Sequence, residues 1–230
     1  ALLVSGDDPG FLLGDGLYET MRVRDGQVVA LEAHLARFEA SRAALALPHP
    51  ATPPEVAIAA VLAANDPRSL EDASLRLTLS ARPTLIVRLR PLTPRNLARR
   101  EGLHLYTLPA RRGESFLARH KSLSAGANAT QQRLHPNGSD LHFEGLWLDP
   151  DGHVLEGTTT NLFALIDGVV LTPPTVSAIL PGISRARVLA ALAALAIPHT
   201  EATFTRTDLD RAEALFATNA LLPVAPVLTL

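Results

Sequence analysis

The sequence predicts an α+β fold, in which antiparallel strands are joined by tight turns and helices occur only occasionally. Three observations carry this prediction. Apolar and polar residues alternate over several segments, which is the period of a half-buried strand. Turn sequences at 25–26, 149–152 and 167–168 separate neighbouring alternating segments, as they do in hairpins. Segments with helical spacing do not alternate regularly with the strands, so we do not expect repeated βα units.

The length and composition suit one large domain or two modest ones with aliphatic cores. The chain has 230 residues, of which 47% are hydrophobic and only 4% aromatic, so Leu, Val and Ala must fill the cores. The pattern breaks between Pro91 and Pro94. We therefore expect an N-terminal α+β domain at 1–92, a linker at about 93–96 and a C-terminal domain at 97–230.

The charge and composition disfavour several classes of protein. A net charge of −2, with no run of like charges, argues against nucleic acid or an anionic membrane as the main partner. The absence of cysteine excludes disulfides, thiolate metal sites and a cysteine nucleophile, and we assign no metal ligands. No charged and then apolar segment opens the chain, and no apolar run reaches membrane-spanning length. We expect a soluble cytoplasmic protein.

The first domain is expected to begin with a short strand at 1–4 and a longer one at 17–23. In the longer strand, Tyr18, Thr20 and Arg22 alternate with mostly apolar neighbours and therefore share one face. A row of Tyr, Thr and Arg suits a polar cavity, but a solvent-exposed face explains it equally well. The Asp-Gly pair at 25–26 turns the chain into a return strand at 28–30.

Two helices and a pair of strands complete the first domain. The segment 31–45 has helical spacing, and 54–65 is an alanine-rich helix with Pro54 near its first turn. The strands 74–80 and 84–90 pair across a short turn. On the first helix, the apolar stripe holds Leu31, Leu35, Phe38 and Leu45 with Arg42 as the exception, and a neighbouring stripe holds His34, Arg37 and Ser41.

The second domain is expected to consist mostly of strands. One long helix is predicted at 185–196, where Pro198 ends it, and a short turn at 208–211. The segment 156–161 is a polar break between two strands. The predicted strands lie at 103–108, 143–148, 153–155, 162–166, 169–171, 201–206 and 214–218.

Lys121 is the only lysine, and the other twenty basic residues that stay charged are arginines. Arginine matches lysine for solubility and ion pairing, but it does not deprotonate in proteins and so cannot supply a nucleophilic amine. A single lysine in such a chain therefore suggests amine chemistry, most simply a Schiff base with a carbonyl compound. The alternative is that compositional drift left one lysine at the surface.

Three other segments look like parts of one anion-and-ring site. Leu180-Pro-Gly-Ile-Ser184 leads into a helix, where the backbone N–H groups of Ile183 and Ser184 and the Ser184 hydroxyl would face an anion. An ordinary helix cap explains this turn at least as well. Thr218, at a strand end, would donate to the same anion, and Glu156 would pair with a protonated ring nitrogen. An amine, an anion site and a carboxylate are what pyridoxal phosphate requires of a protein.

Five motifs occur in order along the chain: Gly14-Asp-Gly-Leu-Tyr-Glu-Thr-Met-Arg22, His34-Leu-Ala-Arg37, His120-Lys-Ser-Leu123, Glu156-Gly-Thr-Thr-Thr-Asn-Leu-Phe163 and Leu180-Pro-Gly-Ile-Ser-Arg185. Together they resemble the class IV aminotransferases, the fold-type-IV pyridoxal-phosphate enzymes, over nearly the whole chain. That family includes branched-chain aminotransferases, D-amino-acid transaminases and 4-amino-4-deoxychorismate lyases. The resemblance implies a smaller N-terminal α/β domain, a C-terminal pseudo-barrel domain and a homodimer.

The resemblance also implies a role for each matching position on the cofactor side. Lys121 matches the Schiff-base lysine, which also carries protons on the substrate face. Glu156 matches the carboxylate on the pyridine nitrogen, which keeps the ring protonated and so an effective electron sink. The positions that match phosphate donors are Arg37, Ile183, Ser184 and Thr218.

On the substrate side, Tyr18, Thr20 and Arg22 match the strand that lines the family's substrate site. Thr20 would assist proton movement, so it joins Lys121 as a candidate catalytic residue. Asn161 matches a residue that either holds the Glu156 loop or contacts the cofactor directly.

One segment departs from the family pattern. Many relatives have an asparagine and then a tyrosine shortly after the lysine, whereas Ser124 replaces the asparagine here and Ala125 and Gly126 stand where the tyrosine would fall. The aromatic support of the cofactor oxygen that branched-chain aminotransferases use is therefore missing. The lysine, phosphate and glutamate positions are intact, so the departure bears on the subtype rather than on cofactor binding.

We favour a 4-amino-4-deoxychorismate lyase, which would release pyruvate and 4-aminobenzoate from a small amino substrate. The chain is short for a branched-chain aminotransferase, and its Gly-Asp-Gly-Leu-Tyr-Glu-Thr block is often seen in the lyase branch. Arg82 and Arg88 are either ligands for substrate carboxylates or plain surface residues. The alternatives are an amino-acid transaminase for branched-chain or D-amino acids and a non-catalytic paralogue that binds pyridoxal phosphate.

Overall fold

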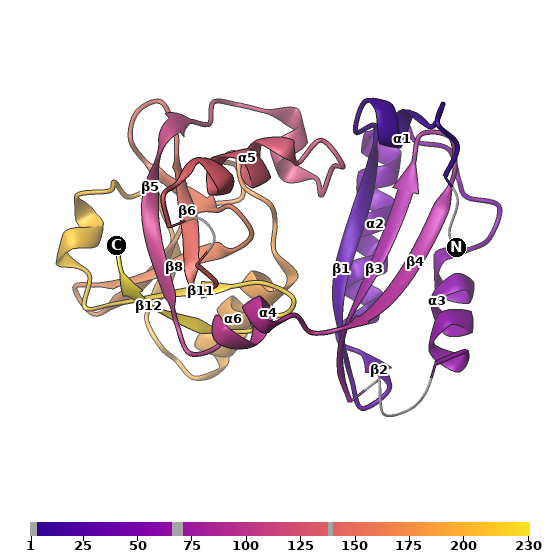
Figure 1. The fold of residues 1–230 in the computed structure, drawn as a ribbon. Helices are drawn as coiled ribbons and strands as arrows, with labels where there is room; N and C mark the ends of the chain where they lie inside the picture. Colours follow the sequence, from indigo (N-terminus) through magenta and orange to yellow (C-terminus); the bar gives the residue numbers. More distant parts are fainter. Residues whose placement is uncertain (1–3, 66–70, 138–139) are drawn as a thin grey trace. The chain divides into compact units, whose positions relative to one another are not determined.

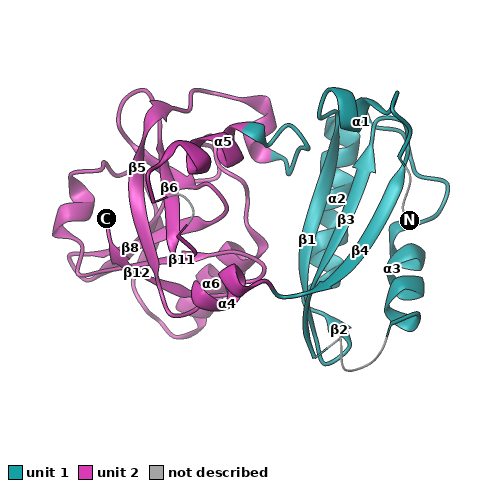
Figure 2. Ribbon diagram, in the orientation of Figure 1, with its two compact units in different colours: residues 1–92, 120–126 teal, residues 93–119, 127–230 magenta. Residues whose placement is uncertain are grey.

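The computed structural model describes residues 4–65, 71–137 and 140–230, so the strand expected at 1–4 lies, apart from Val4, outside the described residues. The chain divides into two compact units (Figure 2). Unit 1 comprises Ala1–Leu92 with His120–Gly126, and unit 2 comprises Thr93–Arg119 with Ala127–Leu230.

The segment His120–Gly126 groups with unit 1, although the sequence assigns everything after residue 96 to the second domain. The reason is backbone pairing with the start of the long strand of unit 1. The Tyr18 N–H donates to the Lys121 carbonyl at 2.8 Å, and the Leu123 N–H donates to the Gly16 carbonyl at 2.9 Å.

Unit 1 is a four-stranded antiparallel sheet with helices on one face (Figure 1). The strand order is β2-β1-β3-β4, with α2 packed on β1 and α3 on β4. The elements are α1 Pro9–Leu12, β1 Gly16–Arg24, β2 Gln27–Val28, α2 Leu31–Ala44, α3 Pro54–Ala63, β3 Asp72–Ser80 and β4 Leu85–Pro91. The strands and helices predicted for this half of the chain after residue 4 are therefore confirmed, with ends shifted by up to two residues.

The alternation in the strands decides which face the helices cover. Leu17, Met21 and Val23 of β1 are buried together with the leucines of β3, and Phe38 of α2 and Ile58 of α3 close the same core. Truncating one of these buried side chains to alanine costs about 2–5 kcal/mol of stability. The predicted polar row of β1 consequently lies on the opposite face of the sheet.

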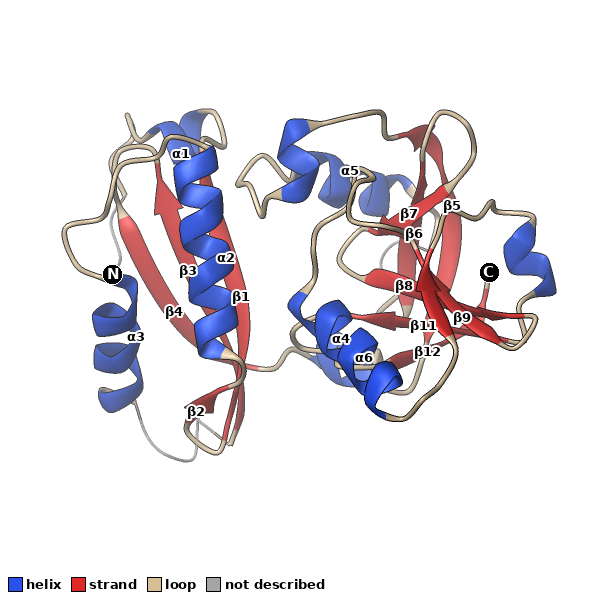
Figure 3. Cartoon of the chain, turned by 180° about the vertical axis from the view of Figure 1, so that it is seen from behind, coloured by secondary structure: helices blue, strands red, loops and turns tan. Residues whose placement is uncertain are grey.

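Unit 2 is an eight-stranded mixed sheet that curls around an apolar interior (Figure 3). The strand order is β10-β9-β8-β11-β12-β5-β6-β7, and the pairs β5–β6, β12–β5 and β10–β9 are parallel. The elements are α4 Pro94–Ala98, β5 Leu103–Arg111, α5 Gly126–Leu134, β6 Phe143–Leu148, β7 Val154–Gly157, β8 Asn161–Ile166, β9 Val169–Thr172, α6 Ile183–Ala194, β10 His199–Glu201, β11 Ala214–Thr218 and β12 Ala225–Thr229.

Unit 2 differs from the sequence prediction in several elements. The strand expected at 201–206 is wrong, because β10 ends at Glu201 and pairs only with β9. The sequence did not predict β12, α4 or α5. Residues 93–96 form the cap and first turn of α4, where the Asn96 N–H donates to the Thr93 hydroxyl at 3.3 Å. No helix of the described part of the chain is long and apolar enough to cross a membrane.

Candidate functional site

Lys121 lies beside the first residues of β1 in unit 1. Its carbonyl accepts from the Tyr18 N–H, and its amine lies 4.4 Å from the centroid of the Tyr18 ring, within cation–π range. Gly16 lets β1 pack closely between β3 and this segment, because a Cβ at that position would collide with the Leu79 carbonyl and the Leu123 side chain. The structure therefore brings together two of the residues that the sequence assigns to one site, Lys121 and Tyr18.

Tyr18 lies close to two cations. Besides the Lys121 amine, the Arg76 guanidinium carbon lies 3.7 Å from the centroid of its ring. Lys121 holds the pKa of Tyr18 below its ordinary value of 10.0, against the opposing effect of burial and with help from Arg76. Burial in turn lowers the pKa of Arg76, although the nearby Tyr18 oxygen counteracts part of that effect. The Tyr18 phenol therefore releases its proton more readily than a tyrosine in water.

Thr20 and Arg22 follow Tyr18 on the same face of β1. Thr20 is paired in register with Arg76 of β3, one row along the sheet from Tyr18. Arg22 donates to both carboxylate oxygens of Asp72, through Nε at 2.8 Å and Nη2 at 2.9 Å. A substrate would have to compete with Asp72 for this guanidinium, so the expected substrate role of Arg22 is the weakest of the three.

Arg37, the expected phosphate ligand, forms a buried ion pair inside unit 1. Its Nε and Nη2 donate to the two oxygens of Glu19 at 2.8 and 2.7 Å, and His34 Nδ1 lies 2.8 Å from Glu19 Oε2. Glu19 is only 2% exposed. Burial opposes ionisation of Glu19, yet the hydrogen bonds from His34 and Arg37 outweigh it and hold the pKa of this carboxyl below its usual range. Glu19 therefore fixes the orientation of the Arg37 guanidinium.

Glu156, the expected partner of a ring nitrogen, lies at the end of β7 in unit 2. Its Oε1 accepts from Arg112 Nη1 at 2.7 Å, and its Oε2 accepts from the Leu180 N–H at 3.0 Å and from Asn161 Nδ2 at 3.1 Å. Asn161 Nδ2 also donates to the Leu180 carbonyl at 3.0 Å. These hydrogen bonds agree with the scaffold role considered for Asn161, and they hold the carboxylate in one orientation.

Arg112, Asn128 and Trp147 form a second group around Glu156 that the sequence reasoning missed. Asn128 Oδ1 accepts from Arg112 Nη2 at 3.1 Å and from Trp147 Nε1 at 2.9 Å, and the guanidinium lies 4.6 Å from the Trp147 ring centroid. Asn128 Nδ2 donates to the Thr158 carbonyl at 2.8 Å. Asn128 follows two residues after the segment 124–126 that departs from the family pattern, which was the one available signal. Arg112 resembles any other arginine in the sequence.

The loop after Glu156 is anchored by a buried ion pair. Glu144 accepts from the Thr159 N–H at 2.7 Å, from the Thr160 hydroxyl at 2.9 Å and from Arg99 Nη1 at 2.5 Å. Glu144 and Arg99 are both almost inaccessible to solvent. The sequence reasoning also missed this pair, because a glutamate in an apolar strand gives no indication of its partner.

The expected anion-binding segments come together around the start of α6. The first N–H groups of α6, which include those of Ile183 and Ser184, have no acceptor within the helix by its geometry. The Ser184 hydroxyl donates to the Asn219 carbonyl at 2.8 Å, so it is engaged rather than turned to an anion. Thr218 is paired with Asn161 in register across β11 and β8.

Thr218 tests whether these residues fit a phosphorylated cofactor. Its side chain is 1% exposed, and among the described residues its hydroxyl has no hydrogen-bond partner. A buried hydroxyl left without a partner costs about 1–3 kcal/mol, which an acceptor oxygen would remove. Gly182, at the start of the helix, leaves no space for a side chain because a Cβ there would collide with Asn161. The donor set therefore fits a phosphate group.

Comparison with known proteins identifies the family. Residues 16–230 match the model of the amino-transferase class IV family. A provisionally named branched-chain-amino-acid aminotransferase of Methanocaldococcus jannaschii is 31% identical, over 97% of this chain and 81% of the relative. A bifunctional aminodeoxychorismate lyase and D-amino acid transaminase of Mycobacterium tuberculosis is 32% identical, over 80% of this chain and 70% of the relative.

Solved structures agree with this assignment. A hypothetical aminotransferase from Mycobacterium tuberculosis in its PLP-bound form superposes with a TM-score of 0.86 at 27% identity, over 100% of this chain and 86% of the other. The family depends on pyridoxal phosphate, as the expected lysine, glutamate and phosphate motifs indicate. The chain belongs to the class IV aminotransferases and is an enzyme of that family, an aminotransferase or a lyase.

Proposed function

We propose that this chain is a 4-amino-4-deoxychorismate lyase that uses pyridoxal phosphate and releases pyruvate and 4-aminobenzoate. The observation that carries the choice of substrate is a field of arginines on the sheet face where Tyr18 lies beside the Lys121 amine. That field suits a substrate with two carboxylates, whereas a branched-chain amino acid offers an apolar side chain.

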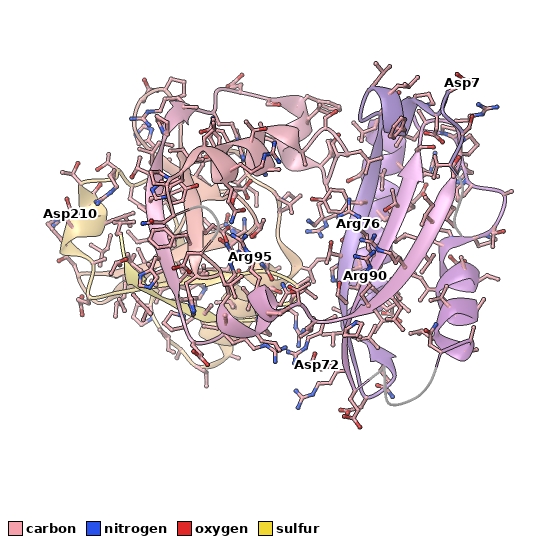
Figure 4. All side chains as sticks on the ribbon, in the orientation of Figure 1. Asp7, Asp72, Arg76, Arg90, Arg95 and Asp210 are labelled. Carbon is pink, nitrogen blue, oxygen red and sulfur yellow. The ribbon has the colours of Figure 1, made fainter. Side chains whose placement is uncertain are left out.

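The arginines are arranged in rows across three strands. Thr20, Arg76 and Arg88 are direct neighbours in one row, and Arg22, Ser74 and Arg90 form the next. Figure 4 shows Arg76 and Arg90 on this sheet, and Asp72 at its lower end. Asp72 pairs with Arg22. Among the described residues, Arg76, Arg88 and Arg90 have no carboxylate partner.

This arrangement supports the dicarboxylate over the other candidate substrates. The rows of a sheet are about 7 Å apart, so Arg76 and Arg88 lie one row from the Tyr18 ring beside which the Lys121 amine is held. A substrate whose amine reacts near Lys121 and whose carboxylate lies across a six-membered ring can reach that row. Guanidinium groups bind carboxylates through charge-assisted hydrogen bonds. An apolar side chain would displace the water that hydrates these guanidinium groups and would offer no hydrogen-bond acceptor in its place.

We assign cofactor binding to Lys121, Glu156, the first N–H groups of α6, Thr218 and Arg37. These positions match the family motifs, and this match supports the proposal. When bound, pyridoxal phosphate supplies an electron sink for the bond-breaking step. Glu156, oriented by Arg112 and Asn161, would hold the proton on the ring nitrogen. Thr218 would bind the phosphate through its unpartnered hydroxyl.

The residues of unit 1 would handle the substrate and its protons. The Lys121 amine would take a proton from the substrate and return one. Tyr18, whose pKa is lowered by Lys121 and then by Arg76 against the effect of burial, would exchange protons with that amine. The Thr20 hydroxyl, next to Arg76, would assist proton transfer during loss of the pyruvate group. We also expect a homodimer, which sedimentation analysis of the purified chain would test.

The alternative function is transamination of D-amino acids or branched-chain amino acids. It is supported by the names of the similar proteins, one of which combines both activities. A transaminase needs a keto-acid acceptor, whereas the lyase needs none. A non-catalytic paralogue is a third candidate, and the intact Lys121, Glu156 and Thr218 positions speak against it.

The experiment compares two reactions of the purified chain loaded with pyridoxal phosphate. One contains 4-amino-4-deoxychorismate alone, and the other contains D-alanine or leucine with 2-oxoglutarate. Formation of pyruvate and 4-aminobenzoate in the first reaction supports the lyase, and Lys121→Ala serves as the inactive control. Turnover only in the second reaction would replace the lyase by the transaminase, and turnover in neither would favour the paralogue.

A further inference from the structure

Three buried side-chain atoms among the described residues have no hydrogen-bond partner: Thr158 Oγ1, Arg185 Nε and Thr218 Oγ1. Arg185 is anchored through another nitrogen, since its Nη2 donates to Glu201 at 2.7 Å. Thr218 is assigned to the phosphate. The Thr158 hydroxyl takes part in none of the contacts described so far, although Thr158 is only 5% exposed and buried hydroxyls are nearly always hydrogen-bonded.

The threonines that follow Thr158 make its isolation specific. Thr158, Thr159 and Thr160 are consecutive in one loop. Glu144 accepts from the Thr159 hydroxyl at 3.1 Å and from the Thr160 hydroxyl at 2.9 Å. The Thr158 hydroxyl is left out of this network. Thr160, which is 4% exposed, and Thr158, which is 5% exposed, are therefore buried to the same extent in one loop, yet only the Thr160 hydroxyl has a partner among the described residues.

The backbone of Thr158 is held on both sides. Its N–H donates to the Gly145 carbonyl at 2.9 Å, and its carbonyl accepts from Asn128 Nδ2 at 2.8 Å. Local backbone rotation cannot carry the hydroxyl to another partner without breaking one of these bonds. The backbone of Thr158 is thus fixed on both sides, and its buried hydroxyl is left to a ligand that reaches this position.

Thr158 is connected to both ends of the candidate cofactor site within unit 2. Asn128, which holds the Thr158 carbonyl, also holds Arg112, and Arg112 in turn pairs with Glu156. At the other end of the loop, Asn219 Nδ2 donates to the Thr159 carbonyl at 3.3 Å, and Asn219 directly follows Thr218. The loop therefore runs between the ring-binding carboxylate and the phosphate-binding threonine.

We infer that Thr158 is a further cofactor-binding residue, whose hydroxyl donates to an oxygen of bound pyridoxal phosphate. The inference rests on the proposed use of that cofactor. A role in binding the cofactor explains why a buried hydroxyl is left without a partner within the described part of the protein. It also explains why Asn128 and Glu144 hold the loop through several hydrogen bonds.

The test is Thr158→Val, which removes the hydroxyl and keeps the shape of the side chain. Because this hydroxyl has no partner in the apo protein, the apo melting temperature should stay the same or rise. The dissociation constant for pyridoxal phosphate should increase about tenfold, the effect of one lost hydrogen bond. Quenching of Trp147, the only tryptophan, reports binding without any measurement of activity. Thr158→Ser, which keeps the hydroxyl, should retain wild-type affinity.

Thr160→Val is the matched control in the same loop. Its hydroxyl is bonded to Glu144, so this variant should lower the apo melting temperature. If Thr158→Val lowers the apo melting temperature in the same way, its hydroxyl has an internal partner and the inference is wrong. It is equally wrong if Thr158→Val binds pyridoxal phosphate as tightly as the wild type while Thr218→Val binds it more weakly. Failure of the wild-type chain to bind the cofactor would instead overturn the proposed function itself, and this inference with it.

Discussion

The two units hold their polar residues in different ways. In unit 1, the open face of the sheet collects cations, and the Lys121 amine and the Arg76 guanidinium both lie against Tyr18. In unit 2, the carboxylates of Glu156 and Glu144 tie the loop that follows Glu156 into a hydrogen-bond network, which leaves the Thr158 hydroxyl without a partner in the part of the chain that the structure describes. The first arrangement suits a variable anionic substrate, and the second suits one invariant cofactor.

The same contrast appears in the two tyrosines of the chain. Lys121 lowers the pKa of Tyr18 in unit 1, against burial and with help from Arg76. In unit 2, burial raises the pKa of Tyr106, and the nearby Glu144 carboxylate adds to that effect. One face is therefore built to stabilise negative charge, whereas Tyr106 lies where a negative charge is disfavoured.

The largest expected effect is that of Lys121→Ala, which removes the central cation of the unit 1 face. We expect activity to fall by at least about 10³-fold, since the proposed function makes this amine both nucleophile and proton carrier. The melting temperature should change little, because the backbone hydrogen bond between Lys121 and β1 is kept and only the contact of the amine with the Tyr18 ring is lost. Steady-state kinetics beside thermal unfolding provide the measurement. Appreciable turnover by this variant would remove Lys121 from the mechanism.

Glu19→Gln should cause the largest loss of stability, because it leaves Arg37 and His34 without their buried carboxylate. The expected cost is about 3–5 kcal/mol in urea unfolding. The pKa of Glu19 is below 4.5 in the folded protein, so its contribution is complete above about pH 4.5 and is lost as the pH falls through the folded value.

The acid limb of the stability curve should therefore flatten in Glu19→Gln. Glu39→Gln is the control, since Glu39 is exposed and pairs only with Arg42. Equal losses of stability in the two variants would mean that burial of the Glu19 cluster has no special importance.

Arg76→Gln should distinguish the arginine field from the cofactor loop. We expect a 10- to 100-fold lower kcat/KM for the dicarboxylate substrate, from loss of about 1.5–3 kcal/mol of charge-assisted hydrogen bonding. Binding of pyridoxal phosphate should stay unchanged. Arg24→Gln, at the exposed end of the same face, is the matched control. A similar loss of kcat/KM in both variants would show that the arginines act through their overall positive charge and not by binding a substrate carboxylate.

The smallest change is expected from Tyr18→Phe in a spectrophotometric titration of the apo protein. The chain has two tyrosines, so the wild type should titrate in two steps, Tyr18 below pH 10.0 and Tyr106 above it. The variant should lose only the early step. A single late step in the wild type would show that Lys121 and Arg76 do not stabilise the phenolate.

Local patterns predicted the parts of the fold that depend on short stretches of chain. Alternation gave β1, β3 and β4, helical spacing gave α2, and the turn before Ile183 gave α6. The sequence did not predict β12, or the parallel pairing of β5 with β6 and β12, because these pairs join strands far apart in the chain. The pairing of strands depends on the environment that the rest of the fold provides as well as on their own residues.

The candidate site divides in the same way. Lys121, Glu156 and Thr218 could be proposed from the sequence because their residue types and neighbouring motifs are distinctive. Arg112, Asn128, Glu144 and Thr158 were missed, since an arginine or a threonine has many ordinary uses and only its partners reveal which applies.

The sequence by itself therefore indicated the family and singled out Lys121 as the candidate amine, because both follow from residue types and motifs. It also placed Tyr18, Thr20 and Arg22 on one strand face, because side chains alternate with a two-residue period. Only the tertiary structure decided which charges are paired and which hydroxyls are left without partners. Hydrogen bonds and ion pairs act over a few ångströms, so they are set by residues that the fold brings together from distant parts of the chain.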